Sequence, residues 1–146
     1  MAGYLDHYGA GEERREKIIK RLVLTAVVLV IVAGVLYFLF KNYRQERQVN
    51  RFFAFLVAQN YQEAYGLWGC TPAKPCRDYP FTEFMKDWGP QSEHANAKAY
   101  HITKTRSCGS GVIVTVGAPN QEDKLWVQRE DLTIGFSPLP GCPAGP

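Results

Sequence analysis

The stretch from Leu22 to Phe40 lacks any charged side chain, and its only side-chain hydroxyl groups belong to Thr25 and Tyr37. It also lacks the polar face that the buried core helix of a soluble protein normally shows. An α-helix of this length measures about 30 Å, which matches the hydrocarbon core of a bilayer. Because each backbone amide in lipid needs a partner inside its own segment, the sequence predicts one membrane-spanning helix.

Processing signals are missing around this stretch. A cleaved signal sequence has a shorter apolar region of roughly 7 to 15 residues and ends in small residues. Here the small pair Ala33 and Gly34 is followed by further apolar residues, and the first cysteine, which a lipoprotein signal needs just after the run, is Cys70. We therefore expect a short cytoplasmic tail over residues 1–17, a transmembrane helix over 18–41 and one folded domain over 42–146.

Signals for nucleic acid and for metal are also missing. After Phe40 the acidic and basic residues nearly balance, and no basic patch interleaves with aromatic residues, so no nucleic-acid partner is predicted. The cysteine spacings C-x5-C and C-x33-C lack the short pairs that hold a tetrahedral zinc ion. The sequence therefore predicts no metal and no other cofactor.

All four cysteines follow the apolar stretch, at Cys70, Cys76, Cys108 and Cys142. An even number in a small domain predicts two disulfides and an oxidising compartment. The order along the chain favours Cys70 with Cys76 and Cys108 with Cys142, although the other pairings and free thiols stay open. Basic residues are slightly more numerous before the apolar stretch than after it, which favours a cytoplasmic N-terminus.

Helical patterns continue beyond the apolar stretch. From Lys41 to Ala58 the chain has no glycine or proline, and Val49, Phe52, Phe53 and Leu56 form one apolar stripe. This continuity predicts that the anchor enters the domain as its first core helix and forms one rigid piece with it. Two shorter helices are expected at 61–68 and 83–88. Thr82 would cap the latter, and Gly89 would end it in a left-handed turn.

After these helices, the spacing of the apolar residues changes from that of a helix to the alternation typical of a β-strand. Four strands are expected at 98–106, 112–117, 124–128 and 132–136, separated by short turns. The valines at 112, 114 and 116 alternate on one face, as do Leu125 and Val127. The sequence therefore predicts an α+β fold, with three helices packed on one face of a curved four-stranded antiparallel sheet.

A family resemblance rests on three groups of residues. They are Phe52-Phe53-x-Phe55-Leu56, Tyr61-x-x-Ala64-Tyr65-x-Leu67 and Phe81-Thr82-x-Phe84-x-x-Asp87-Trp88-Gly89. Their order resembles the small NTF2-like (cystatin-like) domains of exported bacterial proteins, over about residues 48–136. Membrane-anchored proteins of similar layout include secretion-system assembly factors of the VirB8 type and Mce-associated proteins, although their domains are longer.

The resemblance implies a scaffold in the bacterial inner membrane, with its domain in the periplasm and other membrane-protein subunits and the lipid bilayer as partners. A small-molecule ligand inside the cone is the alternative, because the aromatic residues could line a pocket. A pilin-like filament subunit fits less well, because the short leader ending in glycine is missing. An enzyme would need a buried base, and the candidates are Asp78, Asp87, His94 and His101, with His101 favoured.

Candidate contact residues complete the prediction. In the apolar helix, Ala26, Ala33 and Gly34 offer small surfaces for packing against another helix, although no GxxxG motif is present. Outside the membrane, Tyr4 and Tyr8 of the N-terminal tail are candidates for docking onto a partner subunit. On the sheet, Trp126 has the opposite parity to Leu125 and Val127 and is predicted to contact a partner from the outer face.

Overall fold

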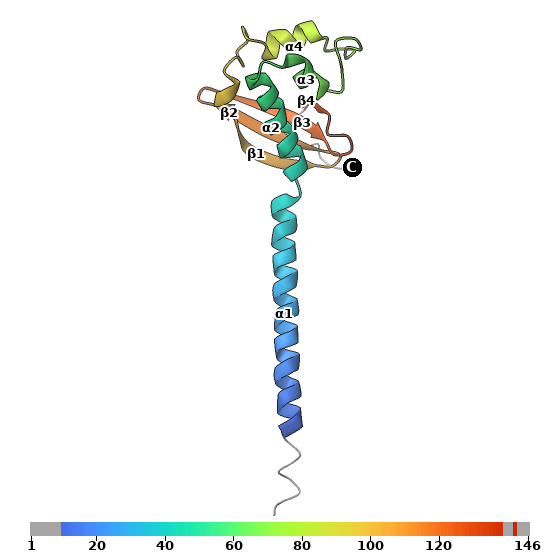
Figure 1. Ribbon diagram of the computed structural model, residues 1–146, viewed down its shortest axis with the longest axis vertical. Coiled ribbons are helices and arrows are strands. Elements are labelled where there is room, and N and C mark those ends of the chain that lie inside the picture. Colours follow the sequence, from blue (N-terminus) through green and yellow to red (C-terminus); the bar gives the residue numbers. More distant parts are fainter. Residues whose placement is uncertain (1–9, 139–141, 143–146) are drawn as a thin grey trace, which may run out of the picture. The chain divides into compact units, whose positions relative to one another are not determined.

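The computed structural model describes residues 10–138 and Cys142, so Tyr4 and Tyr8 lie outside the described residues. The chain divides into two compact units, Met1–Lys41 and Asn42–Pro146, and each is described by itself. The elements, in chain order, are α1 (Ala10–Phe40), α2 (Tyr43–Val57), α3 (Tyr61–Gly66), α4 (Phe81–Trp88), the 3-10 helix η1 (Ala97–Ala99), β1 (His101–Cys108), β2 (Gly111–Ala118), β3 (Gln121–Gln128) and β4 (Ile134–Phe136) (Figure 1). The predicted α+β class is confirmed.

Helix α1 carries the apolar stretch. Among the described residues, one helical stretch is long and apolar enough to cross a membrane, with a mean hydropathy of 2.9 in its most apolar window and no residue of that window buried. The hydroxyl of Thr25 donates to the carbonyl of Arg21 at 2.9 Å, so this polar group is satisfied within the helix. The length and composition of α1 therefore fit a single-pass membrane anchor.

The expected continuation of the anchor into the domain is interrupted. Two turn residues, Lys41 and Asn42, separate α1 from α2. Asn42 is buried, and its side-chain oxygen accepts a hydrogen bond from the hydroxyl of Ser107 at 2.9 Å. A two-residue turn therefore interrupts the expected continuous helix, and a side-chain contact with β1 holds Asn42, the residue just before α2. That the anchor and the domain form one rigid piece stays a prediction.

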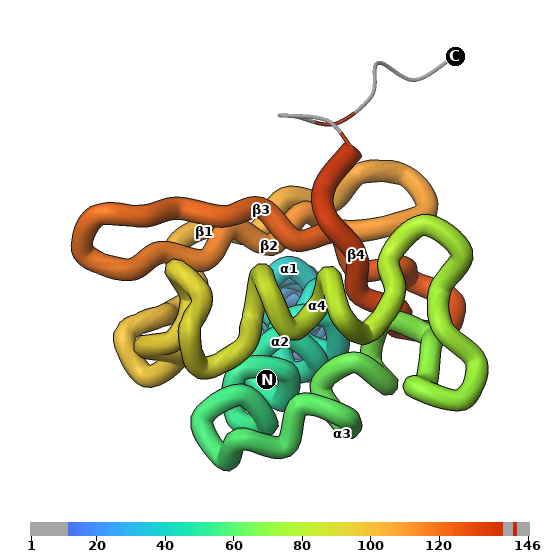
Figure 2. The backbone as a smooth tube through the Cα atoms, turned by 90° about the horizontal axis from the view of Figure 1, so that it is seen from above, coloured from blue at the N-terminus to red at the C-terminus, as the bar shows by residue number. Residues whose placement is uncertain are grey.

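The sheet of the second unit is a meander with the strand order β1-β2-β3-β4, in which every neighbouring pair is antiparallel. Helices α2, α3 and α4 lie on the same side of this sheet (Figure 2). The valines at 112, 114 and 116, together with Leu125 and Val127, are fully buried and belong to the core, as predicted for the inner face. Ile113 and Thr115, between the valines, are also buried, so β2 is covered on both faces. A register shift between Ile102 and Lys104 changes the parity of β1, so that Thr105 pairs with Val114.

The core lies between these helices and the sheet. Helix α2 buries the predicted stripe of Val49, Phe52, Phe53 and Leu56. Tyr65 of α3 and both Phe84 and Trp88 of α4 are at most 1% exposed. The apolar positions predicted for the three helices therefore form one continuous core with the inner face of the sheet.

The ends of α4 differ from expectation. The helix begins at Phe81 after Pro80, whose carbonyl accepts from the amides of Glu83 and Phe84, and no side chain caps it. Thr82 is therefore inside the helix rather than its cap. At the other end Gly89 has φ −75° and ψ 179°, so it is extended and not left-handed. A Cβ at this position would meet the carbonyl oxygen of Met85. Glycine is therefore needed here because the backbone passes close to that oxygen, and not because of a left-handed turn.

This contact leads to a stability prediction. Gly89→Ala is expected to lower the free energy of unfolding by about 1 to 3 kcal/mol, because the chain must shift away from the Met85 carbonyl. Gly66→Ala is the matched control, since a Cβ there meets nothing within 4 Å, and it should be neutral or stabilising by up to about 1 kcal/mol. Chemical denaturation of both variants measures the difference, and equal stabilities would contradict the steric explanation.

Two strands are shorter at one end than predicted. Residues Ala97–Ala99 form η1, so β1 begins at His101 rather than at residue 98. Strand β4 begins at Ile134 rather than at residue 132, because Leu132 has φ 61°, which is incompatible with a strand. The side-chain carboxylate of Asp131 accepts from the amide of Thr133 at 2.9 Å, and this local turn holds Leu132 in place.

Candidate functional site

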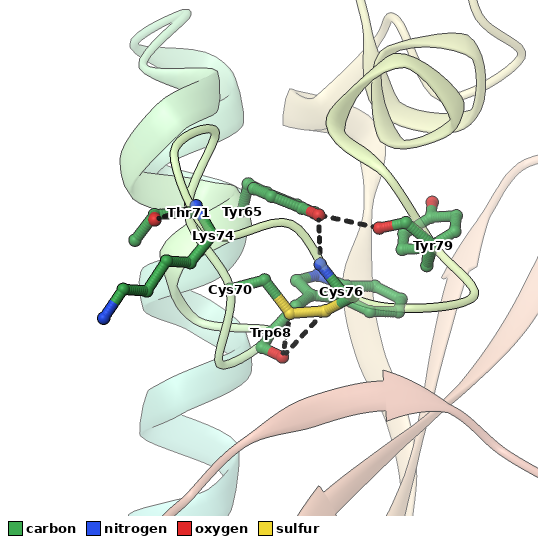
Figure 3. The surroundings of a disulfide bond; sticks show 7 residues. All are labelled: Tyr65, Trp68, Cys70, Thr71, Lys74, Cys76 and Tyr79. Carbon is green, nitrogen blue, oxygen red and sulfur yellow. Dashed lines mark hydrogen bonds between the residues drawn. A yellow bond between two sulfur atoms is a disulfide. The ribbon is translucent and has the colours of Figure 1, made fainter.

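A disulfide joins Cys70 to Cys76 and closes the proline-rich loop between α3 and α4 (Figure 3). Within this loop Thr71 and Lys74 exchange two backbone hydrogen bonds of 3.0 Å each. Both sulfur atoms lie near the carbonyl oxygen of Trp68, at 3.3 and 3.7 Å. The loop is thus a short closed turn, held against the core at its two ends while residues 71–75 are exposed.

Tyr65 connects this loop to the core (Figure 3). Its hydroxyl donates to the carbonyl of Tyr79 at 2.7 Å and accepts from the amide of Cys76 at 3.0 Å. The side chain is fully buried, so neither group can turn to water instead. One hydroxyl therefore satisfies backbone groups on both sides of the segment that leads from the loop to α4.

Tyr65→Phe is expected to lower the free energy of unfolding by about 2 kcal/mol, because it leaves the Cys76 amide and the Tyr79 carbonyl without this partner. The matched control is Tyr61→Phe on the same helix, since Tyr61 is half-buried, and a change below about 0.5 kcal/mol is expected there. Urea denaturation followed by tryptophan fluorescence measures both values. A loss of the same size in the two variants would contradict the bridging role.

The second disulfide joins Cys108 to Cys142 and thereby confirms the favoured pairing. Cys108 ends β1, at one edge of the sheet, whereas Cys142 follows β4, which forms the other edge. This bond therefore ties the segment after the last strand back to the first strand. Together the two disulfides indicate an oxidising compartment.

Aromatic rings fill the space between the helices and the sheet. Phe52 packs against four rings with centroid distances of 5.0 to 6.2 Å, those of Phe53, Trp68, Phe84 and Trp88. Trp68 also contacts Tyr79 at 4.9 Å and Phe136 at 4.8 Å. Edge-to-face and tilted geometries dominate these contacts, as expected for stable ring packing. The aromatic residues that were candidates for a pocket lining are thus packed against one another.

Of the four candidate bases, the structure gives His94 the most contacts. Its Nδ1 lies 2.5 Å from the carbonyl oxygen of Asp87, and its Nε2 lies 3.0 Å from a carboxylate oxygen of Asp123. The amide nitrogen of Gln121 is also 3.0 Å from Nε2. The ring packs on Trp88 with a centroid distance of 4.1 Å. Nδ1 is therefore engaged by a backbone carbonyl, and Nε2 lies between a carboxylate and the side-chain amide of Gln121, so His94 links the segment after α4 to the start of β3.

Two tyrosines border this cluster. The hydroxyl of Tyr79 donates to the Asp87 carboxylate at 2.8 Å, and burial together with that carboxylate raises the pKa of Tyr79. Burial and, second, the Asp123 carboxylate raise the pKa of Tyr100 to about 12. Both hydroxyls therefore stay protonated near neutral pH, and the cluster offers hydrogen-bond donors rather than a base.

The other candidates lie apart from this cluster. His101, the favoured one, is exposed at the start of β1, and its Nδ1 has only a long contact of 3.4 Å with the Ala99 carbonyl. His101, Thr103 and Glu122 border an open hollow on the outer face of the sheet. The hollow lies above Gly117, which has no side chain to fill it. Asp78 is exposed before α4. No grouping of His101 with another candidate base is therefore found in the described part of the chain.

Gln121 and Asp123 were missing from the candidates, although a signal for them exists. They continue the parity of Leu125 and Val127, so the alternation that predicts the core also places these two polar side chains on the inner face of β3. A polar residue at an inward position needs a partner. The partner of Asp123 is His94, which lies in a loop. No periodicity in the sequence indicates where a loop residue lies in space.

The outer face of the sheet differs in one respect from expectation. Trp126 is half-buried, because its indole lies where a Cβ on Gly111 would be. The indole nitrogen donates to the side-chain oxygen of Gln128 at 3.0 Å. Trp126 pairs with Ile113, which pairs on its other side with Arg106, so these three side chains form one row across the outer face. Part of Trp126 thus supports the sheet itself, and contact with a partner stays a prediction.

The small residues of α1 lie as predicted on a surface that nothing in the described unit covers. Ala26 and Ala33 are exposed and Gly34 is half-exposed. A Cβ on Gly34 would meet nothing within 4 Å, so the glycine is not required by its own helix. Packing of this surface against another helix stays a prediction.

Comparison with known proteins gives no relative. No protein-family model, no curated protein and no solved structure matches this chain. What the fold and the sites define is therefore a class: an α+β domain with two disulfides that follows a helix fit to anchor it in a membrane.

Proposed function

We propose that this protein is a non-enzymatic accessory or scaffold subunit of a membrane-protein complex. In this proposal α1 crosses the bacterial inner membrane once, the N-terminus is cytoplasmic and the disulfide-bonded domain lies in the periplasm. The slight excess of basic residues before α1 supports the orientation. The disulfides support a location of the domain outside the cytoplasm.

The observation that carries the proposal is the filled interior of the domain. Phe52, Tyr65, Phe84 and Trp88 are at most 1% exposed and pack ring against ring in the space that a binding cone would leave open. His94, the histidine with the most contacts, has both ring nitrogens engaged by protein groups. The exposed His101 borders an open hollow and has no second candidate base beside it among the described residues, so we take the surfaces of the domain and of α1 to be what the protein offers to other molecules.

Site-specific photo-crosslinking in native membranes tests this proposal. A benzophenone amino acid replaces Ala33 in α1 or Arg106 on the outer face of the sheet, both of which are exposed. We expect a discrete adduct with another membrane protein from at least one of these positions. The control position is Lys86, which is exposed on α4. Adducts that are equal at all three positions, or present at none, would contradict the scaffold proposal.

A ligand-binding domain is the second candidate, and one observation favours it. Within the described residues, the buried indole nitrogen of Trp68 has no hydrogen-bond partner. An unpaired donor in an aromatic interior would suit a small ligand that carries an acceptor. Native mass spectrometry of the protein purified without added lipid distinguishes the two functions: a retained small molecule, lost in Trp68→Phe, would favour binding over the scaffold.

The NTF2-like likeness also belongs to this proposal. It is supported by the order of elements, with helices first and a four-stranded antiparallel meander after them, and by the helices lying on one face of the sheet (Figure 2). An experimental structure of the domain, compared by its strand order and curvature with that superfamily, would decide it.

A further inference from the structure

Three arginines form a stripe along α2. Arg44, Arg47 and Arg51 are spaced i, i+3 and i+7, so they lie on one face of the helix, and all three are exposed. Among the described residues, none of them is paired with a carboxylate, and the one contact found is that of Arg51 with the ring of Phe55, at 5.3 Å. We call these three residues the arginine stripe.

The stripe faces away from the core. The buried residues of α2 are Gln45, Val49, Phe52, Phe53 and Leu56. At about 100° per residue, the centre of the arginine stripe lies roughly 150° around the helix from the centre of this buried set. The only acidic residue of α2 is Glu46, which points about 100° away from its neighbour Arg47. The stripe is therefore a positive surface with no compensating charge on its own helix.

Its charges also repel one another. Arg44 and Arg47 are three residues apart, and Arg47 and Arg51 are four apart, which are the spacings at which like charges destabilise a helix. Neither pair has an acidic side chain between its members on the same face. Each such pair destabilises an exposed helix only slightly, and a bound anion would remove this cost.

The covalent connection limits how far the stripe is from the end of the anchor. Arg44 follows Phe40, the last residue of α1, by four residues, and even a fully extended chain would separate their Cα atoms by at most about 14 Å. From Arg44 to Arg51 the helix rises by about 10 Å. The polar headgroup layer of a bilayer is itself about 5 to 7 Å thick on each side. The Cα atom of Arg44 therefore stays within about 14 Å of the last residue of the anchor, and its long side chain can extend further toward the headgroups.

We propose that the arginine stripe binds the phosphate groups of anionic lipids in the leaflet from which the domain emerges. A guanidinium group has a planar fork of donors that matches two phosphate oxygens. Tyr43, which is half-exposed beside the first arginine, is of the type enriched at the interface between membrane and water. This role goes beyond anchoring, since it adds a charged contact between α2 and the lipid headgroups to the apolar contact made by α1.

Position favours a lipid over an acidic protein as the occupant. The arginine stripe begins four residues after the end of the apolar segment, which is the juxtamembrane position at which basic clusters contact anionic lipid headgroups. Basic residues after the anchor also reduce the charge asymmetry that orients a single span. Their presence there is explained if they bind the membrane that the anchor crosses. The inference rests on α1 spanning a bilayer and does not depend on which complex the protein joins.

Native mass spectrometry of the full chain in detergent micelles tests the proposal, with phosphatidylglycerol and phosphatidylcholine of identical acyl chains as probes. Each basic residue near an anionic surface contributes about fivefold in affinity. The variant R44Q/R47Q/R51Q should therefore bind phosphatidylglycerol at least about tenfold more weakly than the unmodified chain. Binding of phosphatidylcholine should change much less, and the basic residues before α1 are the same in both proteins.

The control variant removes the same charge from another exposed surface of the domain. K104Q/R106Q/K124Q changes three basic residues on the outer face of the sheet, and it should bind phosphatidylglycerol as the unmodified chain does. An equal loss in both variants, or no loss in R44Q/R47Q/R51Q, would overturn the proposal. Loss of a co-purifying acidic protein in R44Q/R47Q/R51Q, with lipid binding unchanged, would identify a protein as the occupant and would overturn it too.

Discussion

Replacing Cys108 and Cys142 together by serine is expected to lower the free energy of unfolding by about 4 kcal/mol. The bond joins residues 34 apart in sequence and connects the segment after β4 to the end of β1, at the opposite edge of the sheet. Without it the unfolded chain gains the entropy of a long loop, and the tail is no longer tied to the first strand.

The second disulfide gives the matched comparison. Cys70 and Cys76 are only 6 residues apart, so their replacement by serine should cost about 2 kcal/mol. Guanidinium denaturation of both double variants, in the full chain and the same detergent, measures the two values. A larger loss from the short loop than from the long one would contradict the view that the Cys108–Cys142 bond is the main covalent support of the sheet.

Phe52→Ala is expected to lower the free energy of unfolding by about 3 to 5 kcal/mol. The Phe52 ring is completely buried and touches four other rings, so its removal leaves a cavity at the point where α2, α3 and α4 meet. Rings of this size cannot move far to fill such a cavity without breaking their own contacts.

Phe55→Ala is the control on the same helix. Phe55 is half-buried at the border of the core and packs with Arg51, so a loss of about 1 to 2 kcal/mol is expected. Thermal and chemical unfolding of both variants measures the difference. If the two losses were equal, the interior around Phe52 would be loosely packed, and the main argument against a binding cone would fail.

Much of the fold was predictable because its signals are local. The alternation of Val112, Val114 and Val116 predicts a strand with one buried face, and these residues are buried in β2. The i, i+3, i+4 and i+7 stripe of α2 follows from spacing in the same way, and the order of the cysteines along the chain favoured the two disulfides that are present while leaving other pairings open. Each of these features depends on neighbours in sequence or on one simple periodicity.

Other features depend on contacts that no local pattern contains. The left-handed conformation of Leu132 accompanies the short turn from Asp131 to Thr133, and Gly89 approaches the Met85 carbonyl four residues before it, but no periodic pattern predicts either conformation. The cluster around His94 forms where a loop after α4 meets the start of β3, at Asp123, 29 residues further along the chain. Asn42, between α1 and α2, accepts a hydrogen bond from Ser107, which lies 65 residues further along the chain. No local pattern therefore predicts the contacts of His94 or the turn between the two helices, whereas His101 as a base stays a prediction.

These packing details bear on function. Aromatic side chains fill the interior of the domain, and His94 links a loop to a strand. The surfaces of the domain are therefore what can contact other molecules. The arginine stripe and the outer face of the sheet are two such surfaces of the domain, and the small residues of α1 are a third on the anchor. We therefore expect these surfaces to have different partners. Lipid headgroups would contact the arginine stripe, and protein subunits would contact the outer face of the sheet and the small residues of α1.

If the protein is a subunit of a larger membrane assembly, it should be isolated together with its partners. Extraction of native membranes in mild detergent, followed by native mass spectrometry of the particle that contains this chain, tests this most directly. The account predicts one defined particle in which this protein and at least one other membrane protein occur in a fixed ratio. A lone monomer that retains a small molecule, or turnover of a substrate by the isolated chain, would contradict it.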